Sequence, residues 1–207
     1  MKLRTLILIS GLAWCTTGQA GITDFQYTSD YSNFFCNATI SYNVDHSVGT
    51  VAMDAYQYAL LGRMGGLITT DTASDPALTI NGEVDNDTSF AWTGYNITVY
   101  MNRSFSLSSV GVGPLPPGWN FSFTPAVHGP GTYYGADEYV ASIHYTQGIG
   151  PAVPVGGEFD FTYTLNFSGS TSYSFTAEMN PVPEPSTAGL ALLGCLLLAG
   201  CRRIRAK

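Results

Sequence analysis

Basic side chains are almost absent from the interior of this chain. The 207 residues include eight Lys and Arg, but only Arg63 and Arg103 lie between residues 21 and 181. The same segment carries fourteen of the fifteen acidic residues, which gives it a net charge of −12. Such a surface repels phosphate backbones, so nucleic acid is excluded as a partner. Acidic polysaccharides are also repelled unless divalent cations bridge them, whereas neutral glycans are not.

Cysteine is equally scarce. Cys36 is the one cysteine between residues 21 and 181, so no disulfide forms within this segment and a hydrophobic core must stabilise it. We expect a buried thiol on a strand; the alternatives are intermolecular pairing and nucleophilic chemistry, and no catalytic motif flanks the residue. The sequence also lacks serine-hydrolase, zinc-protease, phosphate-loop and dinucleotide-binding motifs. We therefore expect a protein that is not an enzyme.

Apolar residues in the interior recur at every second position. In the segment from Phe159 to Phe167, FDFTYTLNF, large apolar side chains alternate with Asp, Thr and Asn, the pattern of a strand with one buried and one solvated face. Similar alternation occurs in five other segments: Thr39 to Val44, Tyr95 to Met101, Asn120 to Phe123, Tyr139 to Tyr145 and Tyr173 to Met179.

Gly- and Pro-rich segments separate these strands, and Asn81-Gly82 has the composition of a tight hairpin turn. Asp54 to Leu61 fits either a short helix or a continued strand. We therefore predict that residues 21–181 form a single all-β domain. Its expected architecture is an antiparallel β-sandwich, Ig-like or jelly-roll in type, of about nine or ten strands.

The first twenty residues are typical of a secretory signal peptide. Lys2 and Arg4 precede the apolar stretch Leu6 to Ala13, and small residues lead up to Ala20. This pattern predicts export through the Sec translocon, with signal peptidase cutting between Ala20 and Gly21.

A lipid anchor on Cys15 is the alternative for this end of the chain. The bulky Trp14 stands where a lipoprotein signal requires a small residue, so cleavage after Ala20 is the favoured interpretation.

The last 26 residues, from Val182 to Lys207, contain three parts in a fixed order. The tripeptide Pro183-Glu184-Pro185 comes first, followed by an uncharged apolar run from Thr187 to Cys201. A basic cluster ends the chain: Arg202, Arg203, Arg205 and Lys207. As a helix the apolar run is about 22 Å long, short of the roughly 30 Å hydrocarbon core but extended by basic side chains that reach the headgroups. The basic cluster places the C-terminus in the cytoplasm and the main body outside.

This order of parts resembles the PEP-CTERM sorting signal of Gram-negative bacteria. The resemblance implies that exosortase recognises and cuts the tail, and that the protein accompanies exopolysaccharide in the cell envelope. The alternating prolines hold the tripeptide extended, a conformation that suits a processing enzyme. A permanently membrane-spanning protein is the alternative.

Two groups of residues are candidates for ligand binding. Five acids lie within seventeen residues: Asp71, Asp75, Glu83, Asp85 and Asp87. They are weak candidates for Ca²⁺, since no EF-hand spacing is present, and a solvated acidic sheet edge is the alternative. Four aromatic residues are candidates for stacking on sugars or for core packing: Trp92, Trp119, Tyr133 and Tyr134.

These observations predict an exported, non-enzymatic protein of the cell envelope or extracellular matrix. It would be tethered briefly to the inner membrane, sorted by exosortase and associated with exopolysaccharide. The alternative is a carbohydrate-binding module, or a small polysaccharide-active enzyme, that carries the same tail.

Overall fold

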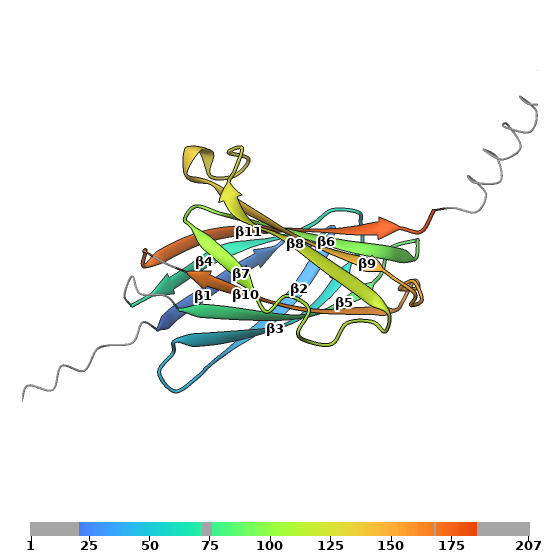
Figure 1. Ribbon diagram of the computed structural model, residues 1–207, viewed down its shortest axis with the longest axis horizontal. Helices are drawn as coiled ribbons and strands as arrows, with labels where there is room; N and C mark the ends of the chain where they lie inside the picture. Colours follow the sequence, from blue (N-terminus) through green and yellow to red (C-terminus); the bar gives the residue numbers. More distant parts are fainter. Residues whose placement is uncertain (1–20, 72–75, 168, 186–207) are drawn as a thin grey trace, which may run out of the picture.

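The computed structural model describes residues 21–71, 76–167 and 169–185. In these ranges the chain forms two β-sheets that pack face to face as a sandwich (Figure 1). The expected all-β sandwich is thus confirmed. The described residues contain eleven strands, slightly more than the nine or ten expected.

The larger sheet has six strands, in the order β1 (Ile22–Ser29), β4 (Gly62–Thr70), β11 (Ser172–Pro183), β6 (Trp92–Met101), β9 (Tyr139–Gln147) and β8 (Trp119–His128). The smaller sheet has five, in the order β2 (Phe34–Tyr42), β3 (Val48–Gln57), β5 (Ala77–Asn86), β10 (Glu158–Phe167) and β7 (Phe105–Ser108). A short 3₁₀ helix, η1 (Gly135–Asp137), lies between β8 and β9.

Strand pairing is antiparallel throughout, except that β3 and β5 run parallel. The intervening strand β4 belongs to the opposite sheet, so the chain leaves the smaller sheet after β3 and re-enters it in the same direction. The purely antiparallel sandwich expected from the sequence is wrong at this one pair.

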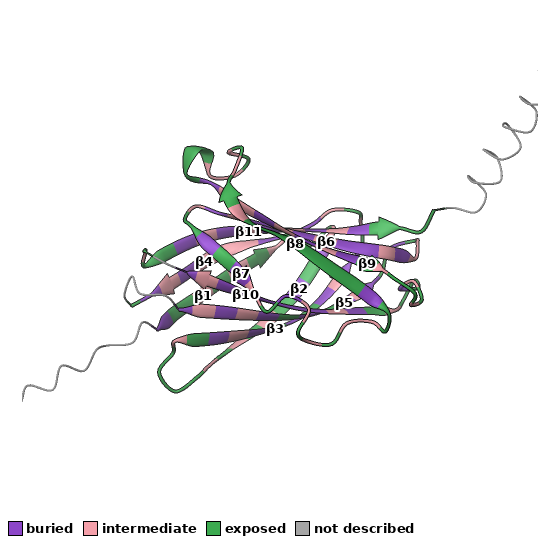
Figure 2. Ribbon diagram, viewed as in Figure 1, coloured by how far each residue is buried: buried purple, intermediate pink, exposed green. Residues whose placement is uncertain are grey.

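Aromatic side chains fill the space between the sheets. The Tyr95 ring lies 4.9 Å from that of Phe159, and the Tyr145 ring lies 5.3 Å from it. Tyr95 keeps its hydroxyl satisfied by donating to Gln57 Oε1 at 3.0 Å. Figure 2 shows buried residues alternating along the strands, as the two-residue period requires. Each fully buried side chain of this size contributes about 1.5–3 kcal/mol.

Two local expectations are wrong for identifiable reasons. Asn81-Gly82 is not a hairpin but lies inside β5, where the Phe161 ring covers Gly82 so closely that a Cβ would overlap it. Thr162, on the supposedly solvated face of β10, is only 7% exposed. The loop after β7 covers Thr162 so closely that a Cβ on Gly113 would overlap Thr162 Oγ1. The segment 54–61 continues β3 as far as Gln57 and contains no helix.

Strand β11 runs into the proline motif. It continues through Pro183, and the Glu184 N–H donates to the Ala91 carbonyl at 2.9 Å. The boundary expected after Pro181 therefore falls inside a strand. Residues 21–185 contain every described strand and the whole described core, so this segment has all the described contacts that hold the sheets together.

Several predicted features lie outside the described residues. These are the signal peptide through Ala20, Asp75, the apolar run Thr187 to Cys201, and the terminal basic cluster Arg202, Arg203, Arg205 and Lys207. Among the residues that are described, no helix has the length and apolar character needed to span a membrane.

Candidate functional site

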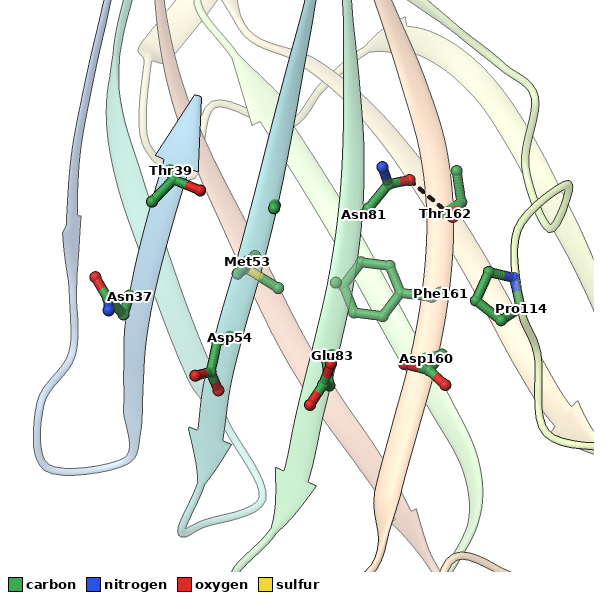
Figure 3. Close-up of a pocket in the computed structure, with 12 residues that line it drawn as sticks. Asn37, Thr39, Met53, Asp54, Asn81, Glu83, Pro114, Asp160, Phe161 and Thr162 are labelled. Carbon is green, nitrogen blue, oxygen red and sulfur yellow. Dashed lines mark hydrogen bonds between the residues drawn. The ribbon is translucent and has the colours of Figure 1, made fainter. Parts of the chain in front are cut away.

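The outer face of the five-stranded sheet carries two neighbouring rows of side chains. Strand register places Asn37, Asp54, Glu83 and Asp160 side by side on β2, β3, β5 and β10; we call them the acidic row. The second row is offset by two residues and consists of Thr39, Ala52, Asn81 and Thr162. Figure 3 shows both rows crossing the four strands.

A hollow of about 360 Å³ lies over these rows; we call it the groove. Ala52 leaves space in its floor because it has only a methyl group. Pro114, on the loop that covers β10, lies at one side (Figure 3). Asn81 Oδ1 accepts a hydrogen bond from Thr162 Oγ1 at 3.0 Å, which fixes both side chains. The volume is at the lower end of the roughly 300–1,000 Å³ typical of small-molecule sites.

Three carboxylates gather at one end of the groove. Oxygen atoms of Glu83, Glu158 and Asp160 lie within 4.8 Å of one another. The Glu158 charge and partial burial raise the pKa of Glu83. Burial first, and neighbouring acids second, raise the pKa values of Glu158 and Asp160. Arg63 and Arg103, the two basic residues in the described part of the chain, contribute nothing to these pKa shifts, so no described cation relieves the repulsion.

These three groups could hold a divalent cation through one oxygen each. Ca²⁺ takes about six to eight oxygen ligands, so water or a bound ligand would have to complete the shell at this largely exposed position. The fit is therefore that of a weak site. The predicted set is brought together only in part: Glu83 joins two acids of β10, and Asp85 pairs with one of these, Glu158. Asp71, Asp85 and Asp87 are not among the three clustered groups.

Aromatic side chains, two of them exposed and one half-buried, continue the outer face beyond the acidic row. Phe35 on β2 pairs with Tyr56 on β3, and their ring centroids are 6.1 Å apart. Tyr31 lies 5.8 Å from Phe35 and is 71% exposed. We call these three residues the aromatic patch; it lies one pleat, about 7 Å, from the acidic row.

The aromatic residues singled out from the sequence lie elsewhere. Trp92 is completely buried and Trp119 is 7% exposed, so both are core residues. Tyr133 and Tyr134 are half-buried on the outer face of the six-stranded sheet, where their hydroxyls bond to Glu178 and Thr176. None of the four borders the groove. Sequence analysis missed Phe35, Tyr56, Asp54 and Asp160, because only strand register brings them together.

Cys36 is buried and lies 3.8 Å from Met64 Sδ. Burial raises the pKa of the thiol to about 12. The thiolate needed for nucleophilic chemistry is therefore scarce at neutral pH, and the expected buried thiol is confirmed.

A buried carboxylate organises the loop between β8 and β9. Glu138 is 0% exposed. Its Oε1 accepts from the backbone N–H groups of Gly131 and Thr132, each at 2.9 Å, and its Oε2 accepts from those of Tyr133 and Tyr134 at 2.6 and 3.2 Å. Burial alone would raise the pKa of Glu138, but these four donors outweigh it and lower the pKa.

The residues at the two predicted cleavage regions differ in exposure. Gly21 is buried, and its backbone nitrogen donates to Asp71 Oδ1 at 2.7 Å. Pro183, Glu184 and Pro185 are all exposed. The proline motif thus lies at the surface and begins with the last residue of β11.

No protein-family model matches this chain, and no curated protein resembles it significantly. The groove and the proline motif must therefore be interpreted from their own chemistry.

Proposed function

We propose that the protein is an exported, non-enzymatic component of the cell envelope or extracellular matrix that binds exopolysaccharide through the groove. The observation that carries this proposal is the groove itself, an open hollow with amide, hydroxyl and carboxylate groups beside the partly exposed aromatic patch. Sugars present hydroxyl edges to polar side chains and C–H faces to aromatic rings. Of the two expected sandwich types, we propose the jelly-roll, because lectin domains have this architecture.

The charge of the groove restricts the glycan. Asp54, Glu83, Asp160 and Glu158 lie in or beside it, on a body whose net charge is −12. A polyanionic polysaccharide would be repelled. The proposed ligand is therefore a neutral or amino-sugar polymer, lying along the strands from the aromatic patch to the groove.

The proposed route to the envelope rests on the PEP-CTERM resemblance. The exposed proline motif is accessible to a processing enzyme. We propose that exosortase, with the Sec translocon and signal peptidase acting earlier, releases the domain from the inner membrane.

Binding is tested by titrating the 21–185 segment with linear neutral, cationic and anionic polysaccharides under calorimetry. Ala52→Phe should fill the hollow and abolish binding without disturbing the core, since Ala52 is exposed. Phe35→Ala should weaken binding about fivefold, as expected for loss of about 1 kcal/mol of stacking. Thr28→Phe, on exposed β1 of the other sheet, is the matched control and should bind normally. Saturable binding that Ala52→Phe leaves intact would exclude the groove as its site.

The clustered carboxylates leave one enzymatic alternative, glycoside hydrolysis. Incubating the same polysaccharides with the segment should release no new reducing ends. If hydrolysis occurs and Glu83→Gln abolishes it, the protein is an enzyme and the non-enzymatic proposal is wrong.

Sorting is tested separately by fusing residues 182–207 to an unrelated exported reporter. In a host with exosortase, the intact mass of the reporter should show loss of the basic cluster. In an isogenic host without the enzyme, the cluster should remain. Retention in both hosts would refute processing and favour a permanent membrane anchor.

A further inference from the structure

Four strands form the free edges of the two sheets: β1 and β8 in the larger sheet, β2 and β7 in the smaller. Unpaired edges expose backbone N–H and C=O groups that can pair with another chain, so proteins usually protect them. Three of the four edges here are protected, and β8 differs.

The side of the sandwich formed by β1 and β2 is protected by side chains. On β2, the Ala38 N–H donates to the Tyr27 hydroxyl at 2.8 Å, and that hydroxyl in turn faces the Ala38 carbonyl at 3.3 Å. Tyr27 thereby occupies the free backbone groups of Ala38 in the middle of β2. On β1, the charged Asp24 accepts from Gln26 Nε2 at 2.7 Å. The third edge, β7, is only four residues long.

Strand β8 is ten residues long and has one neighbour, β9. Among the described hydrogen bonds, no backbone N–H or C=O group of residues 120–127 pairs with a backbone group outside β8 and β9. Phe121 and Phe123 pair with buried Tyr145 and Ile143, so their rings point to the inner side of the sheet. They nevertheless remain 42% and 43% exposed.

Strand β8 and the sequence on either side of it carry no formal charge. Residues 104–136 contain no Asp, Glu, Lys or Arg, although the body as a whole is strongly acidic. Two copies that approach through any face rich in acids repel each other, whereas two β8 edges do not. Strand β8 carries no Asp, Glu, Lys or Arg that would select a partner of opposite charge.

We propose that β8 pairs antiparallel with β8 of a second copy, across a twofold axis at Ser122, and joins the two six-stranded sheets. In this register Ser122 lies opposite itself and Phe121 lies opposite Phe123 of the partner subunit. The two half-exposed rings are thereby covered by aromatic cross-strand pairs, each stabilising by about 0.2–1 kcal/mol. The bulge between Thr124 and Val127, which contains Pro125, limits the pairing to residues 120–124 on each copy.

Disulfide trapping in the 21–185 segment tests both the dimer and its register. Cys36 is the only cysteine of this segment and is buried, so background cross-linking is low. Ser122→Cys should form a covalent dimer under mild oxidation, because directly opposed residues have Cα atoms about 4.5–5.5 Å apart, within disulfide range. Asn120→Cys is the matched control. It lies on the same exposed strand, but its two copies would be four residues out of register, about 13 Å apart, and should not cross-link.

Sedimentation velocity of the unmodified segment provides the second measurement. It should show a reversible dimer whose fraction rises with protein concentration. The Ser122→Lys variant should dimerise with an affinity about three- to fivefold lower. Gln26→Lys, an equal charge change on exposed β1, should leave the dimer unchanged. A monomer at all concentrations, equal cross-linking of both cysteine variants, or cross-linking of neither would overturn the proposal. Thermal unfolding of each variant identifies any that fails to fold.

Discussion

Replacing Glu138 with Gln should detach the loop between β8 and β9 from the sandwich. The glutamine amide keeps one oxygen but turns the other into an N–H₂ group that faces two backbone N–H donors. Two hydrogen bonds to a charged acceptor are then lost, each contributing about 1.5–3 kcal/mol. The side chain is fully buried, so water cannot replace these bonds while the loop keeps its conformation.

The loss to the whole fold is smaller, because the loop can open by itself. Opening sacrifices the bonds from Tyr133 to Glu178 and from Tyr134 to Thr176, together with the edge-on contact of Tyr133 with Tyr100 at 4.9 Å. At about 1 kcal/mol each, these contacts limit the global destabilisation to about 3 kcal/mol. For a domain of this size, that predicts a Tm lower by about 6–12 °C.

Amide hydrogen exchange combined with thermal unfolding measures both effects. In the Glu138→Gln variant, the amides of residues 131–134 should lose protection while those of β9 keep it. The neighbouring exposed residue provides the control, since Asp137→Asn removes a charge without touching the backbone donors. If residues 131–134 stay protected in Glu138→Gln and its Tm moves by less than about 1 °C, the carboxylate does not hold this loop.

Three further predictions concern stability. Asn86→Asp should destabilise the domain by about 3–5 kcal/mol in urea unfolding. The buried Nδ2 of Asn86 donates to the carbonyls of residues 90, 153 and 154, and a carboxylate oxygen in its place would face these acceptors without a proton. The surface control Asn120→Asp should change stability little, and equal effects of the two variants would contradict this role for Asn86. Asp71→Asn should lower the Tm of the protein that begins at Gly21 more than the Tm of the precursor. Cleavage before Gly21 gives the Gly21 nitrogen a positive charge, and this nitrogen already donates to Asp71 Oδ1. Equal losses of Tm in the two forms would argue against such an ion pair. The pKa values of Glu83, Glu158 and Asp160 are raised above their ordinary values of 4.5, 4.5 and 3.8. Their contribution to stability is therefore fully present below the ordinary values and is lost as pH rises through the raised ones, so unfolding scans should show stability increasing as pH is lowered from about 7 toward that range. Below about pH 4 the lowered pKa of the loop carboxylate has the opposite effect, so a profile that falls steadily from pH 7 would contradict this assignment.

The two-residue period predicted the strands well because it depends only on local geometry. Phe159, Phe161 and Leu165 are buried as the alternation requires. The same rule failed at Thr162, since whether an outward side chain meets water depends on a loop fifty residues earlier in the chain. Gly82 misled for a related reason: a glycine that makes space for a ring is indistinguishable in sequence from a glycine that makes a turn.

The groove was beyond prediction because its parts come from four strands. Asn37 and Asp160 are far apart in the sequence, and the parallel pairing of β3 with β5 sets which acids become neighbours. The sequence cluster of acids around Glu83 pointed to the correct strand but to the wrong companions. Their actual neighbours on β10 had no distinguishing local pattern.

The position of β11 determines how the domain withstands force. It lies inside the six-stranded sheet, between β4 and β6, and it leads directly into the proline motif. A pull on the C-terminal side would load both flanking ladders in shear at the same time, so that many hydrogen bonds must break together. An edge strand such as β1 would instead peel from a single ladder. The domain is thus mechanically strongest when the load enters through the C-terminal end of β11.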